Sequence, residues 1–338
     1  MINIDGSFGE GGGAIIRTAT ALSALIGKPI HITNIRANRP KKGLAPQHLT
    51  AVKALSRLTS ASCSGLYLGS SEIYFKPGPI SGGNYHIDIK TAGSTTLVLQ
   101  SLMIPSMFAD SDVNLVIKGG TDVKWSPLID YFKNITLPIL RSLGYQANID
   151  LIKRGYYPRG GGIIKAEINP IKQLKPINLT KMEFNGIKGL SHCSNLPCHV
   201  AARQAQAAVD LLEKKGYNVD IDVQCSDKSL GRGSAIVLWT TGNYPLGGSD
   251  VGEPGKRAKT VGKNAADELL DQISKNAPLD KYMGDQLIPY MAVSGKSTIK
   301  TAELTRHLVT NIYVAEKLMN KKFSVRGRLG EPAVISIE

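Results

Sequence analysis

Residues 304–318, LTRHLVTNIYVAEKL, contain the pattern from which the fold of the whole chain can be interpreted. Apolar residues recur there at helical spacing, which predicts an amphipathic helix: Leu304, Leu308, Ile312, Ala315 and Leu318. Two other stretches have similar length and surroundings, 44–58 (LAPQHLTAVKALSRL) and 125–140 (WSPLIDYFKNITLPIL). We interpret the three as the second helix in three copies of one unit, each built from two helices and a β-sheet.

The segments around these helices alternate between strand-like and helix-like patterns, which predicts an α/β fold. Between the second and third copies, residues 182–275 contain two periodic helices of their own, HVAARQAQAAVDLLEKKG and GKNAADELLDQIS, with strand patterns between them. A segment of this length is typical of a small domain. We therefore expect a large discontinuous domain, 1–181 with 276–338, and a smaller α/β domain inserted at 182–275.

The charge balance favours a polyanionic partner. Lysine and arginine total 41 against 27 aspartates and glutamates, a formal net charge of +14. This excess suits nucleic acid or an anionic substrate, and the alternative is that it only serves solubility. No run of 18 apolar residues and no leader peptide are visible, so we expect no membrane span and a cytoplasmic protein.

The cysteines predict neither a disulfide framework nor a strong metal site. Four cysteines in 338 residues are too few for such a framework. His192, Cys193, Cys198 and His199 are four candidate ligands in one short segment, but their spacing fits no standard zinc pattern. We expect instead that Pro197 opens a helix and that these residues pack at its start.

A glycine-rich turn near the N-terminus is a candidate anion site. In DGSFGEGGGAIIRT, residues 5–18, glycines precede a helix that carries Arg17. Free backbone amides and the helix dipole both favour phosphate at such a turn. Glu10 within the turn is a candidate Mg²⁺ ligand, because this ion prefers carboxylate and phosphate oxygens. The alternative is an ordinary turn with a solvated glutamate.

Two further segments combine arginines with potential ligand contacts. IRANRPKKGLAPQHLTA, residues 35–51, has four basic residues within seven positions, followed by Gln47 and His48 at the start of a helix. This loop is interpreted either as anion-binding or as solvated. RGYYPRGGG, residues 154–162, places arginines beside glycines and offers two tyrosines that could stack on bases.

His307 lies at the start of the helix in the first segment. Thr305 is the expected N-cap, which puts His307 in the first turn. The positive end of the helix dipole disfavours a charged imidazole, so the ring is expected to be neutral, with a lone pair able to attack phosphorus. From these residues alone, a capped surface histidine is the favoured interpretation.

Together these segments resemble the RNA 3′-terminal phosphate cyclase family. The resemblance begins with the N-terminal stretch from Asp5 to Ala54 and covers the whole chain. It continues in order through AGSTTLVLQ, KGGTDVKWSP, YYPRGGG, YMGDQL and RHLVTNI, and includes LPCHVAARQ of the insert. The family resemblance implies a large domain of three repeated two-helix, four-strand units with a smaller α/β domain inserted.

The resemblance also implies an activity. The family converts an RNA 3′-terminal phosphate into a 2′,3′-cyclic phosphate with ATP and Mg²⁺ or Mn²⁺. His307 matches the histidine that takes AMP from the α-phosphate, and AMP then passes to the RNA end before the 2′-hydroxyl closes the ring. Glu10 matches the metal-binding glutamate. The remaining matches are Arg17, Arg39 and Gln47 at phosphate positions, and Gln100, Pro127, Tyr282, Met283, Gly284, Asp285 and Gln286 at the ATP/adenosine site.

Two other interpretations stay open at this point. One branch of the family has lost catalysis and acts as an RNA-binding protein in ribosome assembly, but such members lack the histidine that is present here as His307. Enolpyruvyl transferases have a similar sheet-and-helix repeat and anionic substrates, although the ordered motifs argue against them. The sequence does not identify the physiological RNA, the preferred metal, activity on DNA or 5′-phosphate ends, or whether the chain forms a homo-oligomer.

Overall fold

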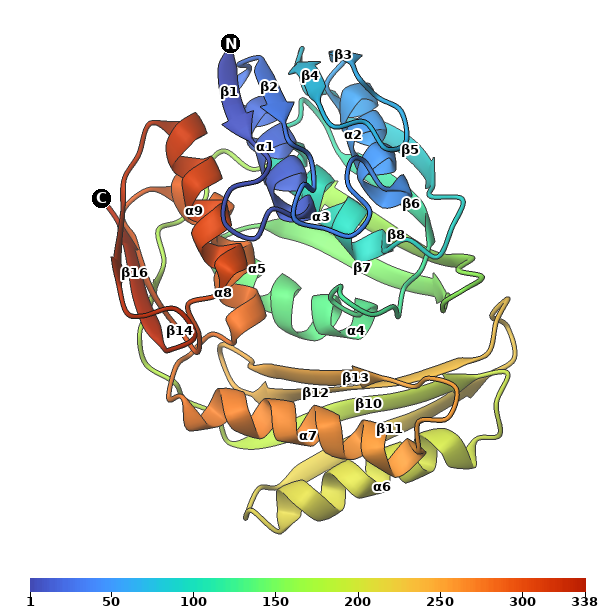
Figure 1. Ribbon diagram of the computed structural model, residues 1–338. Coiled ribbons are helices and arrows are strands. Elements are labelled where there is room, and N and C mark those ends of the chain that lie inside the picture. The colour runs from blue at the N-terminus through green and yellow to red at the C-terminus, as the bar shows by residue number, and fades with distance from the viewer.

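The computed structural model describes residues 1–338 as a mixed α/β protein, the class that the sequence predicted (Figure 1). Three of its four sheets share one arrangement: two parallel strands, then the fourth strand and the third, each antiparallel to its neighbour. This repeated topology confirms three copies of one unit. In spatial order the sheets are β1 (Ile2–Asp5), β2 (Ile30–Thr33), β4 (Ile73–Lys76) and β3 (Ser62–Ser64); β5 (Gly83–Asp88), β6 (Val113–Gly119), β8 (Gly162–Asn169) and β7 (Gln146–Lys153); and β9 (Asn178–Leu179), β14 (Ser297–Thr301), β16 (Ala333–Ile337) and β15 (Phe323–Arg326).

The helices of the three units form the centre of this body. They are α1 (Gly13–Ile26) and α2 (Pro46–Leu58); α3 (Thr95–Ser106) and the run α4 (Ile129–Tyr131), η1 (Phe132–Thr136) and α5 (Leu137–Ser142); and α8 (Lys281–Ser294) and α9 (Arg306–Met319). Helix α1 packs against α2, α3 and α9. Most of its residues are buried, which suits a sequence rich in alanine, isoleucine and leucine. None of the helices combines the length and apolar character needed to cross a bilayer.

The second helix of the middle unit is not a regular α-helix. The sequence pattern predicts one helix over residues 125–140, but Phe132–Thr136 form a π-helical turn just before Pro138. Proline has no N–H to donate, and in an α-helix its ring collides with the carbonyl four residues earlier. We attribute the wider turn to Pro138, because π-helical turns interrupt α-helices in this way.

The fourth sheet interrupts the third unit between β9 and α8. Its spatial order is second strand, first, third and fourth, with the first two parallel and the others antiparallel to their neighbours, so it differs from the other three sheets. Both helices of this segment lie on the side of the sheet that faces away from the body (Figure 1). The elements are β10 (Gly186–Ser194), α6 (His199–Glu213), β11 (Val219–Ser226), β12 (Gly233–Thr241), β13 (Gly247–Val251) and α7 (Ala258–Ser274).

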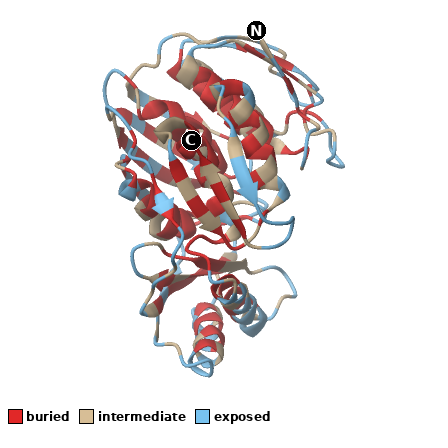
Figure 2. Cartoon of the chain, turned by 90° about the vertical axis from the view of Figure 1, so that its left-hand side faces the viewer, coloured by how far each residue is buried: buried red, intermediate tan, exposed pale blue.

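This inserted layer, which we call the insert, has a small core of its own. Eleven buried apolar residues lie among its sheet and helices, apart from the cluster of 67 in the body. Figure 2 shows the large buried interior of the body above the smaller insert. Ala235 and Val237 of β12 belong to the body's cluster, so one face of the insert sheet packs onto the body. That 182–275 folds as a separate domain stays a prediction.

Candidate active site

His307 occupies the position that the sequence predicted, at the start of α9. The Thr305 hydroxyl accepts the backbone N–H of Leu308 at 2.9 Å, which confirms the cap. The His307 side chain is 45% exposed. Burial, together with the charges of Arg17 and Arg39, lowers the pKa of His307 to about 4. The imidazole is therefore neutral at neutral pH, as expected, but burial and two arginines account for this where the sequence suggested the helix dipole.

The glycine-rich turn folds against α9 and carries Glu10 to His307. The backbone N–H of Glu10 donates to Thr310 Oγ1 at 3.0 Å. The Glu10 carboxylate lies over Gly12, in the space that a side chain there would occupy. The Oε1 atom of Glu10 forms an ion pair with Arg39. The Oε2 atom is buried without a hydrogen bond and lies 3.7 Å from Nδ1 of His307.

Arg17 projects from α1 into the same cluster. Its charge lowers the pKa of both His307 and His48, so the guanidinium lies near both rings. Burial lowers the pKa of Arg17 to about 10, and no acidic group opposes this effect. The side chain forms no hydrogen bond or ion pair with the rest of the chain. A partly buried cation without a counter-ion is unfavourable, which indicates that the site is built to receive an anion.

Helix α2 begins beside this cluster with two polar side chains. The Oε1 atom of Gln47 accepts the backbone N–H of Ser94 at 2.9 Å, which joins the starts of α2 and α3. His48 is 5% exposed, and its ring fills the space where a side chain at Gly13 would lie. Burial and nearby arginines lower the pKa of His48 to about 3. The sequence marked His48 only as a residue at the start of a helix.

Three helices thus begin around one point. Gly13 of α1 touches His48 of α2, while Glu10 reaches His307 of α9. The first two helices have no side-chain cap, at Gly12 and Ala45 respectively. Their first N–H groups are therefore available to a ligand, and the positive end of each helix dipole favours an anion. Together with the arginines, this geometry fits a polyphosphate.

Comparison with known proteins identifies the family. Residues 8–325 match the family model described as RNA 3′-terminal phosphate cyclase. The chain belongs to the RNA 3′-terminal phosphate cyclase family. Curated proteins named RNA 3′-terminal phosphate cyclase include one from Methanothermobacter thermautotrophicus, 48% identical over 337 residues and 100% of both chains. Another, from Pyrococcus furiosus, is 48% identical over 339 residues, covering 100% of this chain and 98% of its own. A third, from Methanosarcina barkeri, is 49% identical over 330 residues, covering 98% of each.

Several residues that the resemblance to this cyclase family assigns to adenosine lie together. Gln100 Nε2 donates to Gln286 Oε1 at 2.9 Å, which joins α3 to α8. Asp285 accepts the hydroxyl hydrogen of Thr305, the residue that caps the helix of His307, at 2.5 Å. Burial raises the pKa of Asp285 well above its usual value. The predicted adenosine residues of α3 and α8 are thereby connected to the His307 helix.

Tyr282 and Pro127, the expected partners of the adenine ring, are held by separate contacts. The Tyr282 hydroxyl donates to Glu268 of the insert at 2.7 Å, and Lys281 Nζ lies 4.9 Å from the ring centre. The carbonyl of Pro127 accepts the Thr96 hydroxyl at 2.7 Å, one turn before Gln100 on α3. Tyr282 remains partly exposed.

Two other residues of the YMGDQ motif serve packing. The Met283 side chain is fully buried in the core of the body. A side chain at Gly284 would collide with Thr301, so this glycine lets α8 approach β14 closely. They hold the helix against the sheet, while Tyr282, Asp285 and Gln286 carry the polar groups.

The candidate ligands of the HCSNLPCH segment do not converge. His192 and Cys193 both lie in β10. The expectation that they pack at the start of the next helix is wrong for His192, which contacts Tyr156 and Asp122, but the Cys193 thiol does lie against the Leu196 and Pro197 carbonyls just before α6. Both residues belong to a strand that is buried along most of its length, and they therefore continue the strand up to Ser194. Cys198 forms a disulfide with Cys225 of β11, a pairing the sequence did not predict, and His199 is the first residue of α6.

A buried charged network was also not predicted. Arg154 NH1 lies 2.7 Å from Asp130 and 3.2 Å from Asp122. His192 Nδ1 lies 2.9 Å from the Tyr156 hydroxyl, and Nε2 lies 3.4 Å from Asp122. Asp122, Asp130 and His192 are close enough together to resemble a metal site. Because the Arg154 guanidinium already pairs with both carboxylates, we interpret the group as an ion network that joins the insert to the body.

Proposed function

We propose that this chain converts the 3′-terminal phosphate of RNA into a 2′,3′-cyclic phosphate, using ATP to activate the phosphate. One observation carries the proposal: the neutral His307 lies 3.7 Å from a Glu10 oxygen that has no hydrogen bond, and near enough to Arg17, a cation with no protein counter-ion, for that charge to lower its pKa. That set fits an anionic electrophile held next to a nucleophile. The names of the relatives supply the substrate class, an RNA 3′-phosphate.

His307 is the nucleophile of the first step. Its Nδ1 faces Glu10, so a proton on Nδ1 leaves the Nε2 lone pair free. Nε2 attacks the α-phosphorus of ATP, forming a P–N bond while the bond to pyrophosphate breaks. Arg17, Arg39, Gln47 and the uncapped helix starts hold the phosphates and offset charge that develops during the displacement. The adenosine lies against Gln100, Pro127 and the YMGDQ segment, with Tyr282 stacking on the base.

AMP then moves to the RNA and departs. An oxygen of the RNA 3′-phosphate attacks the phosphorus bound to His307, so the P–N bond breaks and a pyrophosphate linkage forms. The neighbouring 2′-oxygen next attacks the RNA phosphorus, loses its proton and expels AMP. This closure is intramolecular, and such reactions gain about 7–11 kcal/mol over bimolecular ones when the geometry is favourable. The chain's task is to position the ends and neutralise charge.

Glu10 fits a divalent cation, which we propose to be Mg²⁺ or Mn²⁺. Its Oε2 atom is buried and unpaired, and such ions take one or two carboxylates together with substrate phosphates. When bound, the ion would neutralise phosphate charge and make pyrophosphate a better leaving group. Arg39 fixes the other oxygen, Oε1, and so orients the carboxylate.

The test is label transfer from ATP labelled at the α-phosphate. We expect label on the protein that is acid-labile and base-stable, absent in His307→Ala and retained in His86→Ala, a matched change at an exposed histidine. A 3′-phosphorylated RNA should discharge the label and become resistant to phosphatase. A protein that takes up no label would instead behave as a catalytically inactive RNA-binding member of the family. Label on His307→Ala would place the nucleophile elsewhere.

A further inference from the structure

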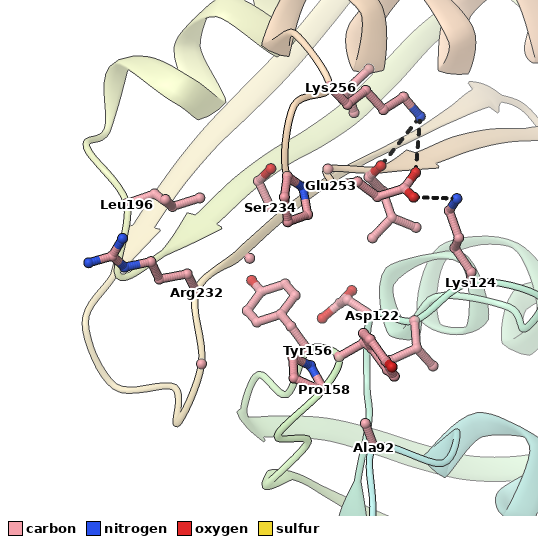
Figure 3. Close-up of a pocket in the computed structure, with 18 of the residues that line it drawn as sticks. Ala92, Asp122, Lys124, Tyr156, Pro158, Leu196, Arg232, Ser234, Glu253 and Lys256 are labelled. Carbon is pink, nitrogen blue, oxygen red and sulfur yellow. Dashed lines mark hydrogen bonds and ion pairs between the residues drawn. The ribbon is translucent and has the colours of Figure 1, made fainter.

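A large cavity lies between part of the insert and the body, and the predicted catalytic chemistry does not use most of it. Its volume is about 1850 Å³, roughly twice the upper end of the 300–1,000 Å³ typical of small-molecule sites. In Figure 3, Ala92 and Pro158 of the body lie on the opposite side of it from Ser234 and Glu253 of the insert. A mononucleotide would leave most of this volume empty.

The wall of the cavity is strongly basic. Seven of the lining side chains are lysine or arginine and two are acidic. Glu253 is 2.6 Å from Lys124 and 3.9 Å from Lys256, so it balances charge at one side. Five basic side chains have no carboxylate partner within ion-pair distance: Arg159, Arg203, Arg232, Arg257 and Lys259. Most of these unpaired basic residues belong to the insert, and their positive charge favours an anionic ligand in the cavity.

Two aromatic side chains on the body side of the cavity are exposed to solvent. Trp125 is 95% exposed and Tyr157 is 78% exposed. Trp125 also has a φ of 60°, a left-handed conformation that is costly for a residue other than glycine. Large exposed rings beside unpaired cations are the combination on which single-stranded nucleic acid binds, with bases stacked on the rings and phosphates held by the cations.

One part of the cavity lies next to the catalytic cluster. Gln47, a predicted phosphate-binding residue, lines its inner end together with Thr91 and Gly93. The next residue along α2, His48, lies close enough to Arg17 and Arg39 for both to lower its pKa, and both also act on His307. The part of the cavity lined by Gln47 is therefore separated by one residue of α2 from the group of side chains around His307.

We propose that this cavity binds the single-stranded RNA nucleotides that precede the 3′ end, with bases stacked on Trp125 and Tyr157 and phosphates bound by Arg232, Arg257 and Lys259. The inference rests on the proposed function, because the cavity would hold the RNA substrate of the same site. We call the cavity, in this role, the track. It assigns the insert a role: it forms the basic wall of the track. Affinity should then depend on the length of the RNA, rising over several nucleotides beyond the terminal one.

A fluorescence experiment tests binding without relying on catalysis. The chain has two tryptophans, so Trp239→Phe leaves Trp125 as the only one. We expect a 3′-phosphorylated oligoribonucleotide of about eight residues to quench Trp125, because stacking on the ring brings base and indole together. A mononucleoside 3′-phosphate should quench it far less. Binding of the oligonucleotide with no change in Trp125 emission would overturn the assignment of the track.

Variants then locate the binding surface. Arg232→Glu with Arg257→Glu, and separately Trp125→Ala, should each weaken oligonucleotide binding and raise the KM for RNA by about tenfold or more. The charge variant should also make binding less dependent on salt. The matched controls lie outside the cavity: Lys214→Glu with Lys215→Glu in the insert, and the exposed Tyr67→Ala. These controls should bind RNA as the unmodified chain does.

The two half-reactions separate failure of this inference from failure of the proposed function. Label transfer from ATP to His307 needs no RNA, so the cavity variants should be labelled normally while losing RNA use. If the unmodified chain takes up no label but the cavity variants still lose RNA binding, the proposed function fails and the track stands. If the cavity variants bind and cyclise RNA as the controls do, the track is wrong.

Discussion

The Oε2 atom of Glu10 lies 3.7 Å from Nδ1 of His307 and forms no hydrogen bond with the chain. Its partner oxygen, Oε1, is held by Arg39. Arg39 thus fixes one oxygen of the carboxylate, while the other oxygen has no hydrogen bond and faces the predicted nucleophile. A buried acceptor without a donor costs free energy, so the arrangement makes sense if a cation occupies that side during the reaction.

Glu10→Gln tests this role. The amide keeps the shape of the side chain but removes the charge that would hold Mg²⁺ or Mn²⁺. We expect the initial rate of His307 labelling from ATP to fall by about 10²-fold. The measurement is the labelling rate over a range of metal concentrations, with Glu72→Gln as the control at an exposed glutamate. An unchanged rate and metal dependence would remove Glu10 from the metal site.

Arg154→Met tests whether the buried ion network joins the insert to the body. The change leaves Asp122 and Asp130 buried without their cation. We expect the free energy of unfolding to fall by about 3–5 kcal/mol, the usual cost of breaking a buried pair from one side. Urea unfolding at pH 7 measures it. Arg159→Met, a change at a more exposed arginine of the same loop, should cost much less.

A rescue variant makes the prediction specific. Adding Asp122→Asn and Asp130→Asn to Arg154→Met removes the two uncompensated charges, so part of the lost stability should return. If the triple variant is no more stable than Arg154→Met, the loss comes from packing and not from charge.

The repeated units could be predicted because the determining signal is local. Helical periodicity in three stretches, each with Thr, Pro or Ser near its start, predicts three second helices, and the shared strand order confirms the repeat. The resemblance to the family then assigned His307, Glu10 and Arg17 to one site. The structure brings these three residues together, although nearly the whole chain separates Glu10 from His307.

Other features depend on packing that no local pattern records. Asp122, Arg154 and His192 have the character of surface residues in the sequence, yet they are buried against one another. The pairing of Cys198 with Cys225 requires the start of α6 to meet β11, which spacing alone does not reveal. The cavity between insert and body likewise arises from how two layers are placed. Sequence reasoning did mark its Tyr157, but not as part of a surface shared with the insert.

His48 predicts a pH dependence of stability. Its pKa in the folded chain is about 3, lowered by burial and by Arg17, Arg36 and Arg39, while an unfolded histidine titrates near 6.5. Between these values the unfolded chain binds the extra proton, so stability is lost as the pH falls from 6.5 toward 3. The contribution approaches about 1.4 kcal/mol per pH unit.

His48→Gln should remove this contribution. Denaturant unfolding at several pH values between 6.5 and 4 should give a flatter curve for His48→Gln than for the unmodified chain. The exposed His86→Gln serves as the matched control and should keep the original slope. Parallel curves for His48→Gln and the unmodified chain would show that His48 is not held neutral by its surroundings.

Arg17 predicts a conflict between stability and activity. Because no protein group compensates its charge, replacing it by methionine should leave the unliganded chain as stable or raise its free energy of unfolding by about 1 kcal/mol. Labelling of His307 should fall at least 10²-fold, because the cation that holds the phosphates is gone.

Pyrophosphate should raise the melting temperature of the unmodified chain and have little effect on Arg17→Met. Arg326→Met, a change at an exposed arginine, should retain both the labelling and the pyrophosphate effect. If Arg17→Met destabilises the unliganded chain and still gains stability from pyrophosphate, then Arg17 serves folding and the phosphates bind elsewhere.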